Sequence, residues 1–258
     1  MAEYTLTVAP NGARRGRDDH PELPVTQDQI VATAVACKAA GAHGIHLHVR
    51  DAAGAHSLDA ERYRDAMAAV ADAAPGMAIQ ITTESAGLFN VAEQLDCLKA
   101  LRPASASVAL REMAREPDMA AQAYALCAEA GTQVQHILYG PSCVELLRRW
   151  YVDGTVPNAM RDVIFVLGQY VPEVLAQPQD LQLFLAATDD LNLNWTVCAF
   201  GRHEQACLLA AISAGGDVRI GFENNIETPS GDLLPDNAAS VAALITAATA
   251  AGHTLKES

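Results

Sequence analysis

A chain of 258 residues, of which 50% are hydrophobic, holds enough apolar material for a large core and lacks the composition of a disordered protein. Its formal net charge of −14 argues against a nucleic acid or an anionic membrane as the main partner, because both require a basic surface. No segment reaches the roughly 20 consecutive apolar residues that cross a membrane, and the start MAEYTLTVAPNG has no leader pattern, so we expect a soluble, cytoplasmic protein.

Short β-branched runs alternate with longer alanine- and leucine-rich segments of helical period along the whole chain. Start signals such as Thr26, Asp59, Pro117 and Asp236 stand where several helices should begin. The pattern predicts strands at 4–8, 44–49, 77–82, 105–109, 132–138, 162–167, 193–199 and 217–221. The helices are predicted at 26–40, 58–73, 90–101, 117–130, 142–152, 172–186, 203–214 and 236–251.

Eight such strand and helix pairs indicate an α/β protein with a parallel sheet. Because about 250 residues match one closed barrel, we expect a single (β/α)8 TIM-barrel domain over residues 1–258. An open, doubly wound sheet is the alternative. In a barrel the active site lies at the C-terminal ends of the strands, so residues that follow each strand are the candidates for chemistry.

The first candidates are His46 and His48 in the predicted strand GIHLHV. Two positions apart in a strand, their side chains point to the same face and their Cα atoms lie roughly 6.6 Å apart. The aliphatic residues that alternate with them should face the helices, which places both histidines in the barrel interior. Two hydrogen-bonded core histidines are the alternative interpretation.

Glu223 follows the last predicted strand. In a closed barrel strand eight lies beside strand one, which lies beside strand two, so Glu223 should meet His46 and His48. Two histidines and one carboxylate with an open position are typical of a catalytic metal site, with zinc favoured over iron or manganese. Arg219 shares the inner face with Glu223, and Gly221 between them leaves room for a substrate or the metal; a structural ion pair is the alternative.

The segments HLHVRD and GGDVRIGFENN resemble the β-keto acid cleavage enzymes, which are zinc-dependent barrels. The likeness continues through VAPNGARR, ITTES, ASASVALRE, FGRHEQ and PDNAASV, and so covers nearly the whole length. The resemblance implies that a β-keto acid and the co-substrate acetyl-CoA give acetoacetate and a new acyl-CoA, with zinc as cofactor. It also implies a homo-oligomer, with a tetramer expected.

The resemblance assigns roles residue by residue. The positions that match the family's zinc ligands are His46, His48 and Glu223. Arg219 matches its catalytic arginine. The positions that match or adjoin its substrate-binding positions are Asn11, Arg14, Thr82, Thr83, Ser107 and Gln135. For the two threonines and the serine, an ordinary strand-end cap is the alternative.

Three positions depart from the family pattern. Asn224, which we also count as catalytic, stands where the family commonly has an aspartate that supports the arginine, and an amide cannot carry that charge. Arg14 stands where members with an amine-bearing substrate have a glutamate, so we expect a neutral or anionic substrate tail, such as a dicarboxylic β-keto acid. A phosphate-facing or surface role is the alternative. Where the family has a glutamate in strand five, this chain offers Gln133, Gln135 or His136.

Other functions of the same barrel stay open: a metal-dependent aldolase or hydrolase, or a barrel that binds a keto acid without turnover. The six cysteines have no paired spacing, and we expect them to be reduced and structural. We expect Arg50 and Asp51 to form a structural ion pair. The histidines expected at the surface are His20, His43, His56 and His253.

Overall fold

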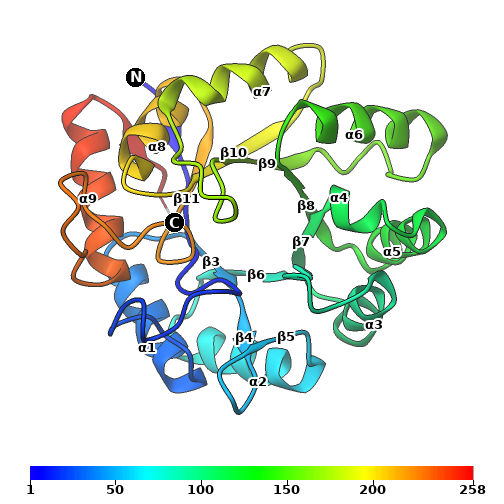
Figure 1. Cartoon of the computed structure of the whole chain (residues 1–258), viewed down its shortest axis with the longest axis horizontal. Helices are drawn as coiled ribbons and strands as arrows, with labels where there is room; N and C mark the ends of the chain where they lie inside the picture. The colour runs from blue at the N-terminus through cyan, green and yellow to red at the C-terminus, as the bar shows by residue number, and fades with distance from the viewer. Residues whose placement is uncertain (258) are drawn as a thin grey trace.

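The structure is a computed structural model that describes residues 1–257. Eight parallel strands close into a barrel, and helices form a ring around it (Figure 1). This architecture confirms the predicted TIM barrel and excludes the open sheet. In spatial order the strands are β2 (Leu6–Val8), β3 (Gly44–Leu47), β6 (Ala78–Thr82), β7 (Ser105–Ala109), β8 (Gln133–Leu138), β9 (Asp162–Leu167), β10 (Asn194–Ala199) and β11 (Asp217–Ile220).

The helices begin largely where the sequence signals stand. Thr26 and Asn90 form capping boxes, and Asp59 and Asp236 each accept a hydrogen bond from a backbone N–H of the first turn. The helices are α1 (Gln27–Ala39), α2 (Ala60–Ala73), α3 (Val91–Leu101), α4 (Leu110–Met113), α5 (Pro117–Ala130), α6 (Pro141–Asp153), α7 (Leu181–Thr188), α8 (Glu204–Ser213) and α9 (Asn237–Ala250). Over residues 1–257, no helix has the length and apolarity that a membrane crossing needs.

The predicted helix 172–186 is wrong at its start. Residues 172–177 form a loop, and the helical conformation begins with the 3-10 turn η1 (Pro178–Asp180) before α7. Gln169 and Val174 pair across this loop with both backbone hydrogen bonds at 3.0 Å. Pro172 and Pro178 lack the N–H that a helix interior needs, so the loop cannot join the helix. The residues that lead into this loop, Gln169 to Val171, lie at the C-terminal end of the barrel.

Two short pairs outside the barrel and helix α4 were not predicted. The strand β1 (Glu3–Tyr4) pairs with β12 (Thr254–Leu255) and ties the two ends of the chain together. The hairpin of β4 (Val49–Arg50) and β5 (His56–Ser57) extends the chain that leaves β3. Because each of these strands has two residues, none carries the alternation that reveals a strand in sequence.

The barrel wall separates two apolar clusters. Outward-facing strand residues join the main core under the helices, as Ile45 and Val134 do. A second, smaller cluster fills one side of the interior with side chains from β7 to β10: Ala109, Ile137, Ile164, Val166 and Cys198. All six cysteines are buried and unpaired in the described chain, as expected. The opposite side of the interior, formed by β2, β3, β6 and β11, is left for polar side chains.

Candidate metal centre

Three buried side chains converge at the C-terminal end of the barrel. His46 lies in β3, His48 follows that strand, and Glu223 follows β11. The Nε2 atoms of the two histidines are 3.2 Å apart, and oxygens of Glu223 lie 3.8 Å from His46 Nε2 and 3.6 Å from His48 Nε2. One ligand atom from each residue lies within 4.8 Å of the other two. The closure of β11 on β2 and β3 thus brings the three predicted residues together.

His46 points the lone pair of its Nε2 into this cluster, toward His48 Nε2. Its Nδ1 lies 2.7 Å from Gln80 Oε1, so the ring carries its proton on Nδ1 and keeps Nε2 unprotonated. Burial lowers the pKa of His46 well below its ordinary value, and the charge of Arg219 lowers it further. A neutral imidazole is the form that binds a metal.

Glu223 stays ionised although it is buried. Burial alone would raise the pKa of this carboxyl, but Arg219 and the two histidines hold it well below its usual range. Arg219 Nη2 lies 3.5 Å from Glu223 Oε1. Among residues 1–257, Glu223 Oε2 and His48 Nδ1 have no hydrogen-bond partner. A buried anionic oxygen that faces two imidazole nitrogens and lacks a donor is suited to a cation.

Sequence reasoning missed Glu84, which adds a second carboxylate to the cluster. Its Oε2 lies 4.0 Å from His48 Nε2. Burial raises the pKa of Glu84, the carboxylates of Glu223 and Glu112 raise it further, and Arg14 opposes the shift. The signal was present in the sequence, because Glu84 follows Gln80 and Thr82 at even spacing and therefore continues the inward face of β6.

The structure separates the two adjacent threonines. Thr82 lines a cavity at the C-terminal end of the barrel, here called the mouth, whose other polar lining residues are Arg14, His46, Glu84, Arg111, Tyr139, Gln169, Tyr170, Arg219 and Glu223. Ser107 Oγ donates a hydrogen bond of 3.2 Å to the Thr82 hydroxyl oxygen. Thr83 points the other way and donates through its hydroxyl to the Ser107 backbone oxygen at 3.1 Å. Thr82 is therefore within reach of a substrate with Ser107 behind it, whereas Thr83 is committed to the backbone.

The loop after β2 closes over the carboxylate. Asn11 is buried and donates to the backbone oxygens of Pro24 at 3.0 Å and His48 at 3.3 Å, and it does not line the mouth. Gly12 has φ +60°, and a Cβ there would lie 2.6 Å from Glu223 Cγ. Only glycine fits this close approach. Arg14, by contrast, is exposed and lines the mouth.

The predicted ion pair of Arg50 with Asp51 is wrong. The Arg50 guanidinium donates instead to the backbone oxygens of Gly12 at 2.6 Å, Arg15 at 2.9 Å and Gly54 at 3.1 Å. Asp51 caps the turn of the β4–β5 hairpin. Carbonyls from two loops thus satisfy one buried cation, which fixes both loops beside the metal cluster.

Two histidines that we expected at the surface are buried. His20 donates or accepts at 2.7 Å with the Leu234 backbone oxygen. His56 packs with its ring centroid 5.2 Å from that of His48, and burial lowers its pKa to about 3. His20 lies on a loop and His56 in the two-residue strand β5, and neither segment is long enough in regular structure to show the sequence alternation that reports burial.

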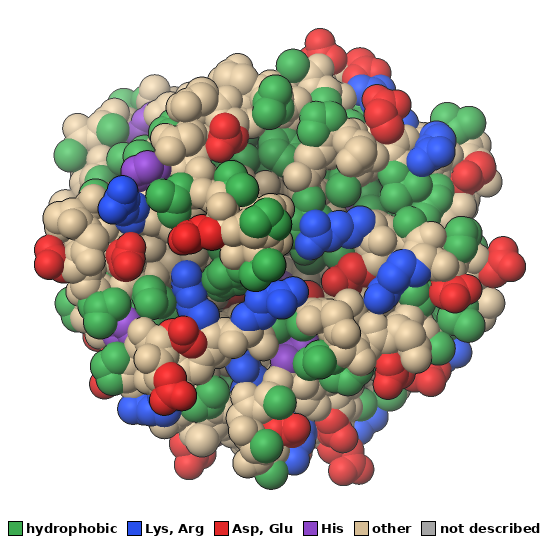
Figure 2. All heavy atoms as spheres, in the orientation of Figure 1, with side chains coloured by type: hydrophobic (Ala, Val, Ile, Leu, Met, Phe, Trp, Pro, Cys, Tyr) green, Lys and Arg blue, Asp and Glu red, His purple; other side chains and the backbone are tan. Residues whose placement is uncertain are grey.

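Basic and aromatic side chains rim the mouth. Arg111, Tyr139 and Tyr170 line it together with Arg14, and sequence reasoning had assigned no role to these three. The Arg111 guanidinium carbon lies 3.3 Å from the centroid of the Tyr139 ring. Figure 2, in the orientation of Figure 1, shows Lys and Arg side chains gathered around the centre of this face. The entrance is therefore locally positive despite the net charge of −14.

The two residues predicted to be catalytic lie differently. Arg219 is buried and lines the mouth. Asn224 is fully buried and does not line the mouth, and its side-chain nitrogen and oxygen have no partner within the described part of the chain. Gly221 does not leave room for a ligand, because a Cβ there would lie 2.4 Å from the Ala9 backbone oxygen. The glycine serves the close packing of two chain segments.

A second buried acid, Glu204, was also missed. Its carboxylate accepts hydrogen bonds from the Gly221 backbone N–H at 3.3 Å and from Asn225 Nδ2 at 3.4 Å. Burial raises the pKa of Glu204 well above its ordinary value. It holds the turn that carries Glu223 and does not itself face the metal cluster.

None of the three polar candidates on β8 lines the mouth. Gln133 and Gln135 line a cavity at the opposite, N-terminal end of the barrel. His136 points outward, with its ring centroid 5.5 Å from that of Tyr124, and burial lowers its pKa to about 4. Gln135 faces the interior, as its alternation with His136 requires, but about one layer too deep to meet a ligand at the mouth.

Comparison with known proteins agrees with this geometry. Residues 3–257 match the sequence model of the beta-keto acid cleavage enzyme family. The chain is 28% identical over 245 residues to the 3-keto-5-aminohexanoate cleavage enzyme of Fusobacterium nucleatum, covering 92% of this chain and 88% of that protein. It is 25% identical over 252 residues to the 3-oxoadipate:acetyl-CoA acetyltransferase of Cupriavidus necator, covering 92% of this chain and 85% of that protein.

Solved structures support the fold. The ternary complex of ObcA with a C4-CoA adduct and oxalate superimposes with a TM-score of 0.69 at 13% identity. The match covers 92% of this chain and 65% of the ObcA chain, so the present chain spans about two thirds of that protein.

Proposed function

Because the chain belongs to the beta-keto acid cleavage enzyme family, we propose that it uses a divalent metal, zinc above all, to cleave a β-keto acid with acetyl-CoA. The CH2–COO⁻ part of the keto acid would join the acetyl group as acetoacetate, and the remaining acyl group would join CoA. The observation that carries the proposal is the convergence of His46, His48 and Glu223 at the mouth. The acetyl-CoA dependence is supported by the name of the 3-oxoadipate relative.

The residues present fit a metal of this kind. Two imidazole nitrogens and one carboxylate leave positions open for a substrate, which is the ligand set of catalytic zinc sites. The unpartnered oxygen of Glu223 and the Nδ1 proton that Gln80 fixes on His46 both point to a cation between the three side chains. A metal bound there would polarise a keto oxygen as a Lewis acid.

The hydroxyl pair would orient the substrate carboxylate. Thr82 Oγ1 already accepts hydrogen bonds from Ser107 Oγ at 3.2 Å and from the Glu84 backbone N–H at 3.0 Å. Both lone pairs are then used, so the Thr82 hydroxyl proton remains to be donated into the mouth. These contacts favour Thr82 over Thr83 as the residue that contacts the substrate.

Arg219 would supply positive charge beside the reacting group. It is buried, and the negative charge of Glu223 raises its pKa although burial opposes the shift. The apolar wall of Ile137, Val166 and Phe200 faces it across the mouth. A fixed cation against a dry wall stabilises negative charge that develops on a substrate oxygen more strongly than water does.

The substrate tail would be neutral or anionic, with a second carboxylate the best match. Arg14 and Arg111 both line the mouth and are exposed, so both are free to meet a charged tail. Tyr139 holds the Arg111 guanidinium by stacking. An ammonium tail would be repelled by both arginines.

The test is mass spectrometry of the purified protein with acetyl-CoA and β-keto acids that carry cationic, neutral and anionic tails, with metal content measured on the same sample. We expect acetoacetate and a new acyl-CoA, the anionic tail preferred. A metal-loaded protein that consumes keto acid without acetyl-CoA would indicate an aldolase or a hydrolase. Binding of keto acid without any product would indicate a binding protein, and absence of bound metal would contradict the metal site.

We also propose that the chain works in the cytoplasm as a homo-oligomer, with a tetramer expected. Six free, buried cysteines are usual for a reducing compartment. Light scattering on the eluted protein tests the oligomer, and a mass of one chain, 27.2 kDa, would contradict it.

A further inference from the structure

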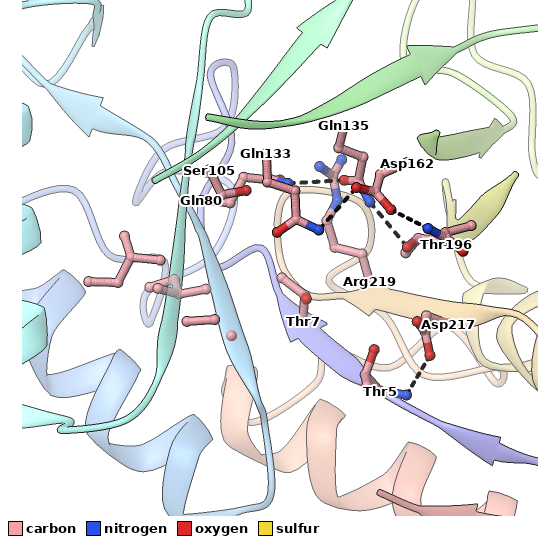
Figure 3. Close-up of a pocket in the computed structure, with 15 residues that line it drawn as sticks. Thr5, Thr7, Gln80, Ser105, Gln133, Gln135, Asp162, Thr196, Asp217 and Arg219 are labelled. Atoms are coloured by element: carbon pink, nitrogen blue, oxygen red, sulfur yellow. Dashed lines mark hydrogen bonds between the residues drawn. The ribbon is translucent and has the colours of Figure 1, made fainter. Parts of the chain in front are cut away.

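The barrel has a second opening at its N-terminal end. A cavity of about 210 Å³ lies there and is lined by the first inward-facing residues of the strands, among them Thr7, Gln80, Gln135 and Thr196 (Figure 3). Barrel interiors are ordinarily filled with branched aliphatic side chains at this level. We call this cavity the floor of the barrel. A water molecule needs on the order of 10–15 Å³, so the floor has room for several.

A chain of hydrogen bonds crosses the floor and ends on the metal cluster. His46 Nδ1 lies 2.7 Å from Gln80 Oε1, Gln80 Nε2 donates to Gln135 Oε1 at 3.3 Å, and Gln135 Nε2 donates to Thr196 Oγ1 at 3.1 Å. Figure 3 shows Gln80, Gln135 and Thr196 lying around the same cavity. All three side chains are half-buried, so solvent reaches them from the floor.

This chain of hydrogen bonds has two self-consistent directions. In one, His46 donates from Nδ1 and every amide donates onward to Thr196. In the other, the Thr196 hydroxyl donates, both amides are turned over, and His46 must carry its proton on Nε2. Only the first direction leaves Nε2 free for a metal, and it is the direction seen here.

Arg219 links the floor to the mouth. It lines both cavities, and its Nε and Nη1 have no hydrogen-bond partner among residues 1–257. Buried guanidinium nitrogens ordinarily find a partner. The floor cavity, which Arg219 and Thr196 both line, has room for water that would accept from these nitrogens and solvate the free end of the hydrogen-bond chain.

We propose that Gln80, Gln135 and Thr196 are positioning residues that set the tautomer of His46 from a hydrated floor. The inference rests on the proposed metal site at His46, His48 and Glu223. Its consequence is that metal affinity depends on side chains on the far side of His46 from the substrate. Hydrogen-bond partners behind a metal-binding histidine typically change affinity 10- to 100-fold.

The experiment compares metal dissociation constants by chelator competition in matched variants. Gln80→Met keeps the length of the side chain and removes the acceptor, and we expect about 10- to 100-fold weaker binding. Gln80→Glu can only accept from Nδ1, so it fixes the same tautomer without being oriented by Gln135, and affinity should stay within about threefold of the wild type. Gln133→Met is the control, because Gln133 lines the same floor but donates to Asp162 outside the hydrogen-bond chain. Unchanged affinity in folded Gln80→Met, or an equal loss in Gln133→Met, would overturn the proposal.

Nitrogen NMR of the His46 ring in metal-free protein separates this inference from the metal function. The wild type should hold its proton on Nδ1, whereas Gln80→Met should populate both tautomers. Equal tautomer populations in the two proteins would overturn the positioning role even if a metal binds. A wild type that shows the expected tautomers but binds no metal would overturn the proposed function and leave the hydrogen-bond chain intact.

Discussion

The mouth and the floor of the barrel are both polar, but they differ in how their polar groups are paired. The mouth holds a buried anion, Glu223, whose Oε2 has no partner in the described chain. In the floor, the group behind His46 is neutral, and its members Gln80, Gln135 and Thr196 are hydrogen-bonded to one another. The floor acids Asp162 and Asp217 accept hydrogen bonds from the Gln133 side chain and from the Thr5 backbone N–H.

This difference indicates which end of the barrel binds a ligand. A buried polar atom without a partner costs about 1–3 kcal/mol, and more when it is charged. A fold tolerates that cost where a ligand removes it, so the mouth is the binding end. Neutral, paired amides have no such need, and they serve best as supports for the residues in front of them.

The strongest test of this contrast is Glu223→Gln, which removes the buried anion of the mouth. We expect loss of bound metal and a fall in turnover on the order of 10³-fold, since a metal acting as a Lewis acid supplies several kcal/mol. Metal analysis and the acyl-CoA assay measure both. Glu204→Gln is the matched control, because Glu204 is equally buried but faces Gly221 and Asn225. Full metal content in Glu223→Gln would remove the central claim.

A histidine in the barrel wall, between the mouth and the floor, makes the stability of the fold depend on pH. His136 lies beside Gln135 on β8 but points outward, and burial lowers its pKa to about 4 from an ordinary 6.5. The unfolded chain therefore takes up this proton first as pH falls. The stability that depends on neutral His136 is complete above pH 6.5 and is lost between pH 6.5 and 4, by about 3 kcal/mol.

Urea unfolding of the metal-free protein at several pH values measures this loss. His136→Gln should show a shallower fall than the wild type over the same window, and the half-buried His253→Gln serves as control. Parallel curves for wild type and His136→Gln would show that acid acts elsewhere, with the charged mouth the first place to look.

The fold was largely predictable because the strands are buried on both sides. The strands 105–109 and 162–167 were predicted to the residue, and the second is a β-branched and aromatic run, DVIFVL, that ends at Gly168. The start of the predicted helix 172–186 failed because EVLAQ has helical composition, while Pro172 and Pro178 delay the first helical turn to residue 178.

The site was predictable where it depends on the alternation of side chains along a strand and on the closure of the barrel. It was not predictable where it depends on loops. His46 and His48 follow from spacing, and Glu223 from the adjacency of β11, β2 and β3. Tyr170 and Arg111 come from loop or short helical segments whose course no periodic pattern reports. Gln135 was assigned to the correct face at the wrong depth, because alternation gives the side of the wall but not the layer.

A sharper probe of the mouth is Arg14→Glu, which reverses one charge at its rim. We expect the preference for an anionic over a neutral substrate tail to fall roughly 30-fold, because an exposed charge contact is worth about 1 kcal/mol and the reversal turns that attraction into a repulsion of similar size. Competition between two β-keto acids in one assay measures the ratio. Arg17→Glu changes the same net charge in the same loop but lies outside the mouth lining. An equal effect of both variants would show that only the overall field matters.

Asn224→Asp is expected to give the smallest change, and it tests a departure from the family pattern that lies outside the lining of the mouth. Asn224 is fully buried, and both polar atoms of its side chain lack a partner within residues 1–257. Arg219, five positions earlier in the sequence, keeps two nitrogens without a partner in the same part of the chain. Asn224→Asp adds a carboxylate that would balance the arginine, so we expect turnover to rise about threefold to tenfold, near 1 kcal/mol. Asn225→Asp is the control, because Asn225 Nδ2 donates to Glu204 and a carboxylate there would repel it. Unchanged or slower turnover in a folded Asn224→Asp would mean that the mouth is already balanced around the amide, and that Arg219 acts as a fixed cation rather than as half of an acid–base pair.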